Sequence, residues 1–339
     1  MKKEMSDEKA INRRDFLKKA GLAGAGLYLV GCANKSSRSL PTPFSEMNPA
    51  TIQETDAPDI QTAETLEPAN GAAYLAVARG EDTAEITRRA IAAVGGMERF
   101  VKNGADVIIK PNICTDYYSY EYAATTNPIV VATLVSLALD AGAARVRVMD
   151  NPFGGTAQSA YKRSGIEDAV NAAGGEMEVM NQNKFRKADI PNGLDINQWD
   201  FYKDILDADV VIDVPIAKNH GTTGLTLGGK NLMGTILNRG QIHANIHQRI
   251  ADLVSRIKPA LTVVDAVRIL VDNGPTGGNL DDVKQLNTII ASADIVAADA
   301  YGASLFGFKG SDIGYIKAAA DMGLGILDLA SIKIEEIAV

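Results

Sequence analysis

The segment 209–234, DVVIDVPIAKNHGTTGLTLGGKNLMG, indicates both the fold class and the position of a functional site. It begins with the run VVIDV at 210–214, which is long enough for one strand buried on both faces and too short for a core helix. Proline has no N–H to donate to a strand ladder, so we expect the strand to end at Pro215 and a glycine-rich loop to follow. Ligands of open α/β sheets bind at the ends of strands, and the polar residues of this loop are therefore site candidates.

Strand and helix patterns alternate along the rest of the chain. Strand patterns lie at 72–80, 105–112, 145–150, 260–270, 287–292 and 331–337, and helix patterns lie at 83–93, 129–142, 159–175 and 241–258. Parallel strands need crossovers of this kind, so residues 71–339 are predicted to form an α/β domain with a mostly parallel, doubly wound sheet and helices on both faces. The polar segment 181–207 is typical of a small β insertion.

Lysines and amides follow two of the predicted strands in a similar arrangement. Lys110 and Asn112 close the strand at 105–112, and Lys218 and Asn219 follow the run at 210–214. Two strands thus bring lysines, which hold carboxylates or phosphates, to one edge of the sheet, while glycines let the backbone approach a ligand. The residues expected to bind a ligand or cofactor are Asn112, Lys218, Asn219, Gly228, Gly229, Lys230 and Asn231. An ordinary glycine-rich connection with solvated lysines is the alternative.

All three histidines, His220, His243 and His247, lie in or just after this segment. His243 and His247 are four residues apart in the helix predicted at 241–258, which places them on one face, where two imidazoles can share a metal ion. His220, Asp213 or Asp265 could complete the metal shell, although the residue after His243 is alanine and not the glutamate of a metalloprotease. Anion binding by the histidine pair and a purely structural role are the other interpretations.

The candidate catalytic residues are His220, Lys230 and Lys110. A desolvated lysine can also be a point of covalent attachment. Cys114, four residues past Lys110, is read as either buried filler or a nucleophile, and the tyrosines of 117–122 as either a lid or surface packing.

The N-terminus has the pattern of an export signal. The run NRRDFLK at 12–18 resembles the twin-arginine signal, and LVGC at 29–32 resembles a lipoprotein processing box. The resemblance implies a signal at 1–32, use of the twin-arginine export machinery, and anchoring to a membrane by a lipid on Cys32, with the protein in the periplasm or on the outer face of a membrane. The polar segment 33–70 is predicted to be a flexible tether. An uncleaved amphipathic start is the alternative.

The net charge of −8 argues against nucleic acid as a partner and leaves any basic site local. The only cysteine besides Cys32 is Cys114, so no cysteine cluster can bind zinc or an iron–sulfur centre. A small anionic ligand is the expected partner.

Several motifs together resemble the family called domain of unknown function 362. They are IIKPN at 108–112, VPIAKNHGTTGLTLGGKNLMG at 214–234, VVDA at 263–266, GPTGG at 274–278 and SADIVAADAYGASLFG at 292–307, and the resemblance spans about residues 73–335. Other members of that family are fused to ferredoxin-like modules, whose cysteine clusters this chain lacks.

A second similarity is local. The order of His220, Lys230 and a later histidine is similar to part of the nickel-dependent lactate racemase. That similarity implies a nickel-pincer cofactor on Lys230, nickel bound by His243 or His247, and His220 as acid or base. The racemase has a further catalytic histidine before this segment, and here Lys110 or a tyrosine of 117–122 would have to replace it.

The patterns together favour an envelope-anchored enzyme that acts on a small anionic substrate with a bound metal or cofactor, by racemase-like, isomerase-like or redox chemistry. A non-catalytic lipoprotein that binds a ligand or metal is the alternative.

Overall fold

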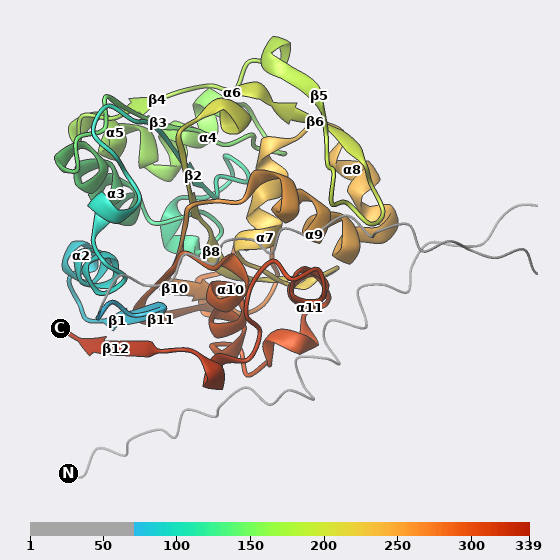
Figure 1. The fold of residues 1–339 in the computed structure, drawn as a ribbon. Helices are drawn as coiled ribbons and strands as arrows, with labels where there is room; N and C mark the ends of the chain where they lie inside the picture. The colour runs from blue at the N-terminus through green and yellow to red at the C-terminus, as the bar shows by residue number, and fades with distance from the viewer. Residues whose placement is uncertain (1–70) are drawn as a thin grey trace, which may run out of the picture.

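The computed structural model describes residues 71–339 (Figure 1). The predicted signal at 1–32 and tether at 33–70 lie outside the described residues.

The described chain is built on a ten-stranded sheet whose main strand order is β12-β1-β11-β10-β7-β2-β3-β4. The strands are β1 (Leu75–Arg79), β2 (Asp106–Pro111), β3 (Arg145–Val148), β4 (Glu176–Met177), β7 (Val210–Val214), β8 (Ile216–His220), β9 (Gly224–Thr226), β10 (Leu261–Leu270), β11 (Val283–Ser292) and β12 (Ile334–Ala338). Strands β10, β7, β2, β3 and β4 are mutually parallel, and β12 is parallel to β1. The predicted α/β class with a mostly parallel sheet is confirmed.

Helices cover both faces of this sheet (Figure 1). One face carries α2 (Thr83–Ala93), α3 (Pro128–Asp140), α4 (Ala157–Ser164) and α5 (Ile166–Ala172); the other carries α9 (Ile246–Ile257), α10 (Ile295–Ser304) and α11 (Gly314–Asp321). Side chains alternate between the two cores along each central strand. In β2, Val107 and Ile109 pack under α2 and α3, whereas Ile108 packs on the opposite side. Burial on both faces explains why these strands read as continuous apolar runs.

Strand β11 departs from the expected parallel arrangement. It is antiparallel to both neighbours, β1 and β10. The segment 271–282 between β10 and β11 contains only the short 3₁₀ turn Leu280–Asp282, so the chain returns directly and not through a crossover helix.

The expectation that the chain leaves the sheet at Pro215 is wrong. After β7 the chain continues at once as β8, which pairs with β10 and with β9, so Lys218, Asn219 and His220 lie on a strand. Proline lacks only the N–H; the Pro215 carbonyl still accepts a hydrogen bond from Asp265 N at 2.8 Å. The strand pairing is therefore maintained across the proline.

Two predicted helices are each divided. The helix predicted at 159–175 is split into α4 and α5 at Gly165, whose φ of 77° is left-handed. The helix predicted at 241–258 is α8 (Arg239–Ile242), a 3₁₀ turn (His243–Asn245) and α9. The backbone of Asn245 has φ −148° and ψ 64°, which is not helical and breaks the register between His243 and His247.

Segment 181–207 forms a separate two-stranded antiparallel sheet of β5 (Phe185–Asp189) and β6 (Gln198–Tyr202), followed by α6 (Lys203–Asp207). Its Phe185, Phe201 and Tyr202 pack into the core on the α9 side of the main sheet. Within residues 71–339, none of the helices has the length and apolar character needed to span a bilayer.

Candidate functional site

A cavity of about 370 Å³ opens where β2, β3 and β8 end. The polar residues that line it are Lys110, Asn112, Cys114, Asp150, Asn151, Lys218, His220, Thr226, Lys230, Asn231, Arg239 and His243. Lys110, Asn112, Asp150, Lys218 and His220 lie on or next to the ends of strands. Lys230 and Asn231 lie on α7 (Gly228–Asn231), and Arg239 and His243 lie in the α8 region. The structure thus brings together most of the basic and amide side chains that the sequence singled out.

Lys110 is fully engaged at the base of this cavity. Its Nζ donates to Asn231 Oδ1 at 2.8 Å and to the Pro111 carbonyl at 3.0 Å, and it forms an ion pair with Asp150 Oδ1 at 2.9 Å. The Lys110 side chain is only 1% exposed. An ammonium has three protons to donate, so these three partners satisfy the group.

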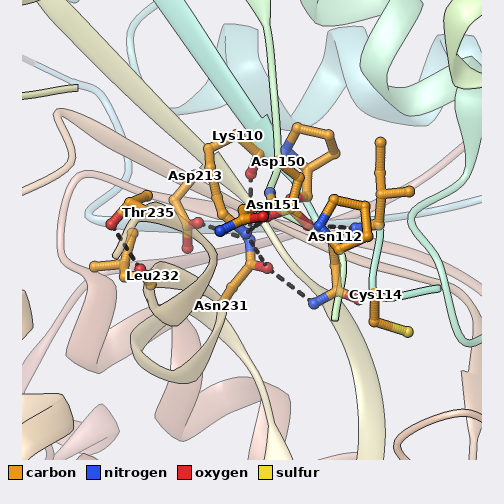
Figure 2. A network of polar contacts seen from close by, with 12 residues as sticks. Lys110, Asn112, Cys114, Asp150, Asn151, Asp213, Asn231, Leu232 and Thr235 are labelled. Atoms are coloured by element: carbon orange, nitrogen blue, oxygen red, sulfur yellow. Dashed lines mark hydrogen bonds and ion pairs between the residues drawn. The ribbon is translucent and has the colours of Figure 1, made fainter. Parts of the chain in front are cut away.

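Asn231 connects the strand ends, and Figure 2 shows it between Lys110, Asn112 and Asp213. Its Oδ1 accepts from Lys110 Nζ and from Asn112 Nδ2 at 2.9 Å, and its Nδ2 donates to Asp213 Oδ1 at 2.8 Å and to the Lys110 carbonyl at 3.2 Å. Because the Lys110 ammonium can only donate, the Asn231 atom that it contacts must be the amide oxygen. Asp213 is buried on the far side of this amide, and burial raises its pKa well above the ordinary value.

Lys218 is buried, and no carboxylate of residues 71–339 forms an ion pair with it. Its Nζ donates to the Ala124 carbonyl at 2.6 Å and to Asn112 Oδ1 at 2.9 Å, and lies 3.5 Å from Cys114 Sγ. Burial lowers the pKa of Lys218 below its ordinary value. The charge of this lysine is solvated by neutral oxygens and a sulfur, so its field extends into the cavity.

Lys230 and Arg239 are two further cations without a carboxylate within 4 Å among the described residues. Lys230 Nζ has a single weak contact, with Met233 Sδ at 3.7 Å, and burial together with the nearby Lys218 lowers its pKa to about 8. Arg239 donates to the carbonyls of Asn151 and Pro152, at 2.7 and 3.2 Å, and burial lowers its pKa.

His220 is a neutral donor. Its Nδ1 accepts a hydrogen bond from Thr222 N at 3.1 Å, so the ring proton lies on Nε2. Burial and the neighbouring Lys230 lower the pKa of His220 to about 3, which keeps the ring uncharged at neutral pH. In this tautomer His220 can donate a hydrogen bond to a ligand oxygen, whereas acting as a base at Nε2 would require the other tautomer.

The predicted metal pair is not formed. His243 lines the cavity, but His247 is not among the lining residues and packs on α11, where a Cβ at Gly314 would be 2.6 Å from His247 Cγ. The physical reason is the break at Asn245, which removes the helical spacing between the two rings. Among residues 71–339 no three His, Cys, Asp or Glu side chains are placed to hold a metal ion.

The two carboxylates considered as metal ligands also have other partners. Asp213 binds Asn231, and Asp265 accepts backbone N–H groups of Asn127 and Val267 at 2.7 and 3.0 Å. Burial raises the pKa of Asp265 to about 6. Neither of these carboxylates lines the cavity.

Three residues expected to contact a ligand instead contact the protein. The amides of Gly228 and Gly229 donate to the Asp299 carboxylate at 2.6 and 2.8 Å, and burial raises the pKa of that carboxyl to about 7. Asn219 Oδ1 accepts from Gly274 N at 2.6 Å and so fixes the loop after β10. These bonds use the groups that the sequence interpretation assigned to a ligand.

Two lining residues have roles that the sequence analysis missed. Asp150 follows β3 and neutralises Lys110, and its place as the last residue of the strand predicted at 145–150 was a usable signal. Arg239 lies in the segment expected to precede a helix, and nothing in its local sequence indicated a site. Cys114, left open between filler and nucleophile, lines the cavity next to Lys218.

The fold and the cavity define an α/β protein with a ligand-sized, cation-lined site at the carboxyl ends of its central strands. The profile of the family described as domain of unknown function (DUF362) matches residues 107–304, and the chain belongs to this family, as the sequence resemblance predicted.

The chain is also similar to two other proteins. The "Thylakoid-associated protein sll1697" of Synechocystis sp. is 28% identical over 222 residues, which are 62% of this chain and 66% of that protein. The chain thus spans slightly less than two thirds of this relative. The lactate racemase apoprotein from Thermoanaerobacterium thermosaccharolyticum aligns with a TM-score of 0.42 and 12% identity, over 65% of this chain and 54% of the racemase.

Proposed function

We propose that this protein binds a small organic anion in the cavity described above. The observation that carries the proposal is an excess of positive charge: Lys218, Lys230 and Arg239 surround a cavity whose one lining carboxylate, Asp150, is paired with Lys110. A unit charge at 4 Å from one of these cations gains about 4 kcal/mol at an effective dielectric constant of about 20. An anion is the species that gains most from this site.

The size and walls of the cavity favour an organic ligand over an inorganic ion. Its volume of about 370 Å³ is in the range of small-molecule sites. Phe153, Met233 and Pro275 supply apolar wall, and Phe153 is 56% exposed at this site. An anion with a carbon skeleton would cover these surfaces, whereas a simple inorganic anion would not.

We also propose that the protein acts in the cell envelope, after twin-arginine export and attachment of a lipid to Cys32. The twin arginines Arg13 and Arg14 and the box ending in Cys32 support this location. The thylakoid association in the name of the Synechocystis relative agrees with a protein held at a membrane.

Calorimetric titration of the purified protein with oxalate tests the anion proposal. We expect oxalate to bind, and we expect Lys230→Met to weaken binding by about tenfold or more, which corresponds to about 1.4 kcal/mol. Lys187→Met is the matched control, because Lys187 lies exposed on β5 away from the cavity. Absence of binding, or equal affinities for wild type and Lys230→Met, would contradict the proposed site.

Two functions are compatible with an anion in this cavity. The first is an enzyme that acts on the anion, and the second is a binding lipoprotein without catalysis. The free amine of Lys230 favours an enzyme, because a group that only positions an anion would gain from a fixed hydrogen-bond partner. Prolonged incubation with a bound organic acid, followed by chemical analysis, separates the two: a binding protein returns the acid unchanged.

A further inference from the structure

We propose that Lys230 forms a Schiff base with the carbonyl carbon of a 2-oxo acid bound in the cavity, an inference that rests on the anion site proposed above. Such an acid carries a carboxylate directly beside its carbonyl. The cavity offers a cation for the carboxylate and the Lys230 amine for the carbonyl carbon.

Hydrogen bonding distinguishes Lys230 from the other two cavity lysines. Lys110 has three oxygen partners within 3.0 Å. Lys218 has two oxygen partners within 2.9 Å and the Cys114 sulfur at 3.5 Å. Among residues 71–339, the only hydrogen-bond partner of Lys230 is the Met233 sulfur at 3.7 Å, although its side chain is partly buried. The amine of Lys230 is therefore the one whose donors and lone pair remain available to a ligand.

The surroundings of Lys230 also favour the neutral amine, which is the nucleophilic form. With a pKa of about 8, about a tenth of this side chain is neutral at pH 7, against fewer than about one in a thousand for a solvated lysine. The cause is burial first and then the positive charges of Lys218 and Arg239. The positive charges that make the cavity cationic thus also favour the neutral, nucleophilic form of the Lys230 amine.

Two other lining side chains can orient the acid. Arg239 donates hydrogen bonds to the Asn151 and Pro152 carbonyls, and the remaining N–H groups of its guanidinium can bind a carboxylate. His220 keeps a proton on Nε2 and can donate it to the carbonyl oxygen. A hydrogen bond to that oxygen polarises the carbonyl toward attack.

The step balances without an oxidant, a reductant or a second substrate. The neutral amine attacks the carbonyl carbon and forms a C–N bond, while the carbonyl oxygen gains a proton that the nitrogen loses. The resulting carbinolamine loses its hydroxyl with the second amine proton as one molecule of water, and a C=N bond remains. Hydrolysis reverses the step and returns the acid.

Reductive trapping tests the inference. The purified protein is incubated with pyruvate and cyanoborohydride at pH about 8, digested, and analysed by mass spectrometry. We expect the peptide with Lys230 to gain the mass of pyruvic acid less one oxygen atom, and to be labelled about tenfold or more faster than that with exposed Lys187, because burial lowers the pKa of Lys230. Oxalate, an anion without a ketone carbon, should suppress labelling of Lys230 and leave Lys187 unaffected.

Separate outcomes bear on the inference and on the anion site. If calorimetry detects oxalate binding but pyruvate does not label Lys230 above Lys187, the Schiff base is refuted and the anion site stands. If neither acid binds and Lys230 is not labelled, both proposals fail. Lys230→Arg keeps the charge without the amine, so it should retain oxalate binding within a few-fold and form no adduct at residue 230.

Discussion

Removal of the Asn231 amide should destabilise the protein substantially, because this one side chain joins the ends of β2 and β7. Asn231→Ala deletes four hydrogen bonds: two accepted, from Lys110 and Asn112, and two donated, to Asp213 and the Lys110 carbonyl. All four partner atoms belong to buried residues, so most of them lose a partner that bulk water cannot replace.

The size of the effect follows from these bonds. Two of them join neutral groups, at about 1 kcal/mol each, and the two that involve the Lys110 ammonium and the Asp213 carboxyl are worth at least about 1.5 kcal/mol each, which gives about 5 kcal/mol. Asn231 borders the cavity, and water entering there restores part of the loss. We therefore expect the free energy of unfolding to fall by about 3 kcal/mol.

Urea unfolding followed by circular dichroism measures this change. With an m-value of about 3 kcal/mol/M, the midpoint of Asn231→Ala should lie about 1 M below that of wild type. Asn183→Ala is the control, because Asn183 is exposed and far in the chain from the network; it should change the free energy of unfolding by about 0.5 kcal/mol or less. A loss below about 1 kcal/mol for Asn231→Ala would refute the structural role assigned to this amide.

Three further predictions concern close packing, pH and membrane attachment. A Cβ at Gly234 would lie 2.0 Å from Asp150 Oδ1, so Gly234→Ala should disrupt the buried ion pair of Lys110 and Asp150. We expect the free energy of unfolding, measured by urea unfolding, to fall by about 3–5 kcal/mol. Gly240→Ala, whose Cβ meets no atom within 4 Å, should be neutral or stabilising; equal losses would argue against the clash. The pKa of Lys230 is about 8 in the free protein, and a bound anion raises it, so oxalate binding at pH about 8 should take up about half a proton. Calorimetry in buffers of different ionisation enthalpy measures this uptake, and proton release would contradict the sign. Cys32→Ser should shift the protein from the membrane to the soluble fraction of its host, and unchanged fractionation would argue against the lipid anchor.

The sheet was largely predictable because its central strands are buried on both faces. The runs ending in Lys110 and before Pro215 are apolar and short, and the polar residues after them meet at one edge as parallel strands require. The antiparallel direction of β11 could not be read from its own residues, since direction depends on the connection and not on the strand pattern.

The errors at the site arise from contacts that a local pattern does not record. Gly228 and Gly229 bind Asp299, which is about 70 residues away in the chain, and Asn219 binds the loop at Gly274. Spacing alone cannot show that the protein itself satisfies these groups. The histidine pair failed for a local reason, a single non-helical residue at Asn245 that helical periodicity does not reveal.

The central claim is that cations with no carboxylate partner among residues 71–339 hold a small organic anion in this cavity. A crystal structure determined with oxalate, at a concentration that saturates the calorimetric signal, tests it most directly. The prediction is oxalate inside the cavity, with carboxylate oxygens within hydrogen-bond distance of Lys230 and Arg239. Oxalate bound elsewhere on the protein, with the cavity empty, would contradict the claim.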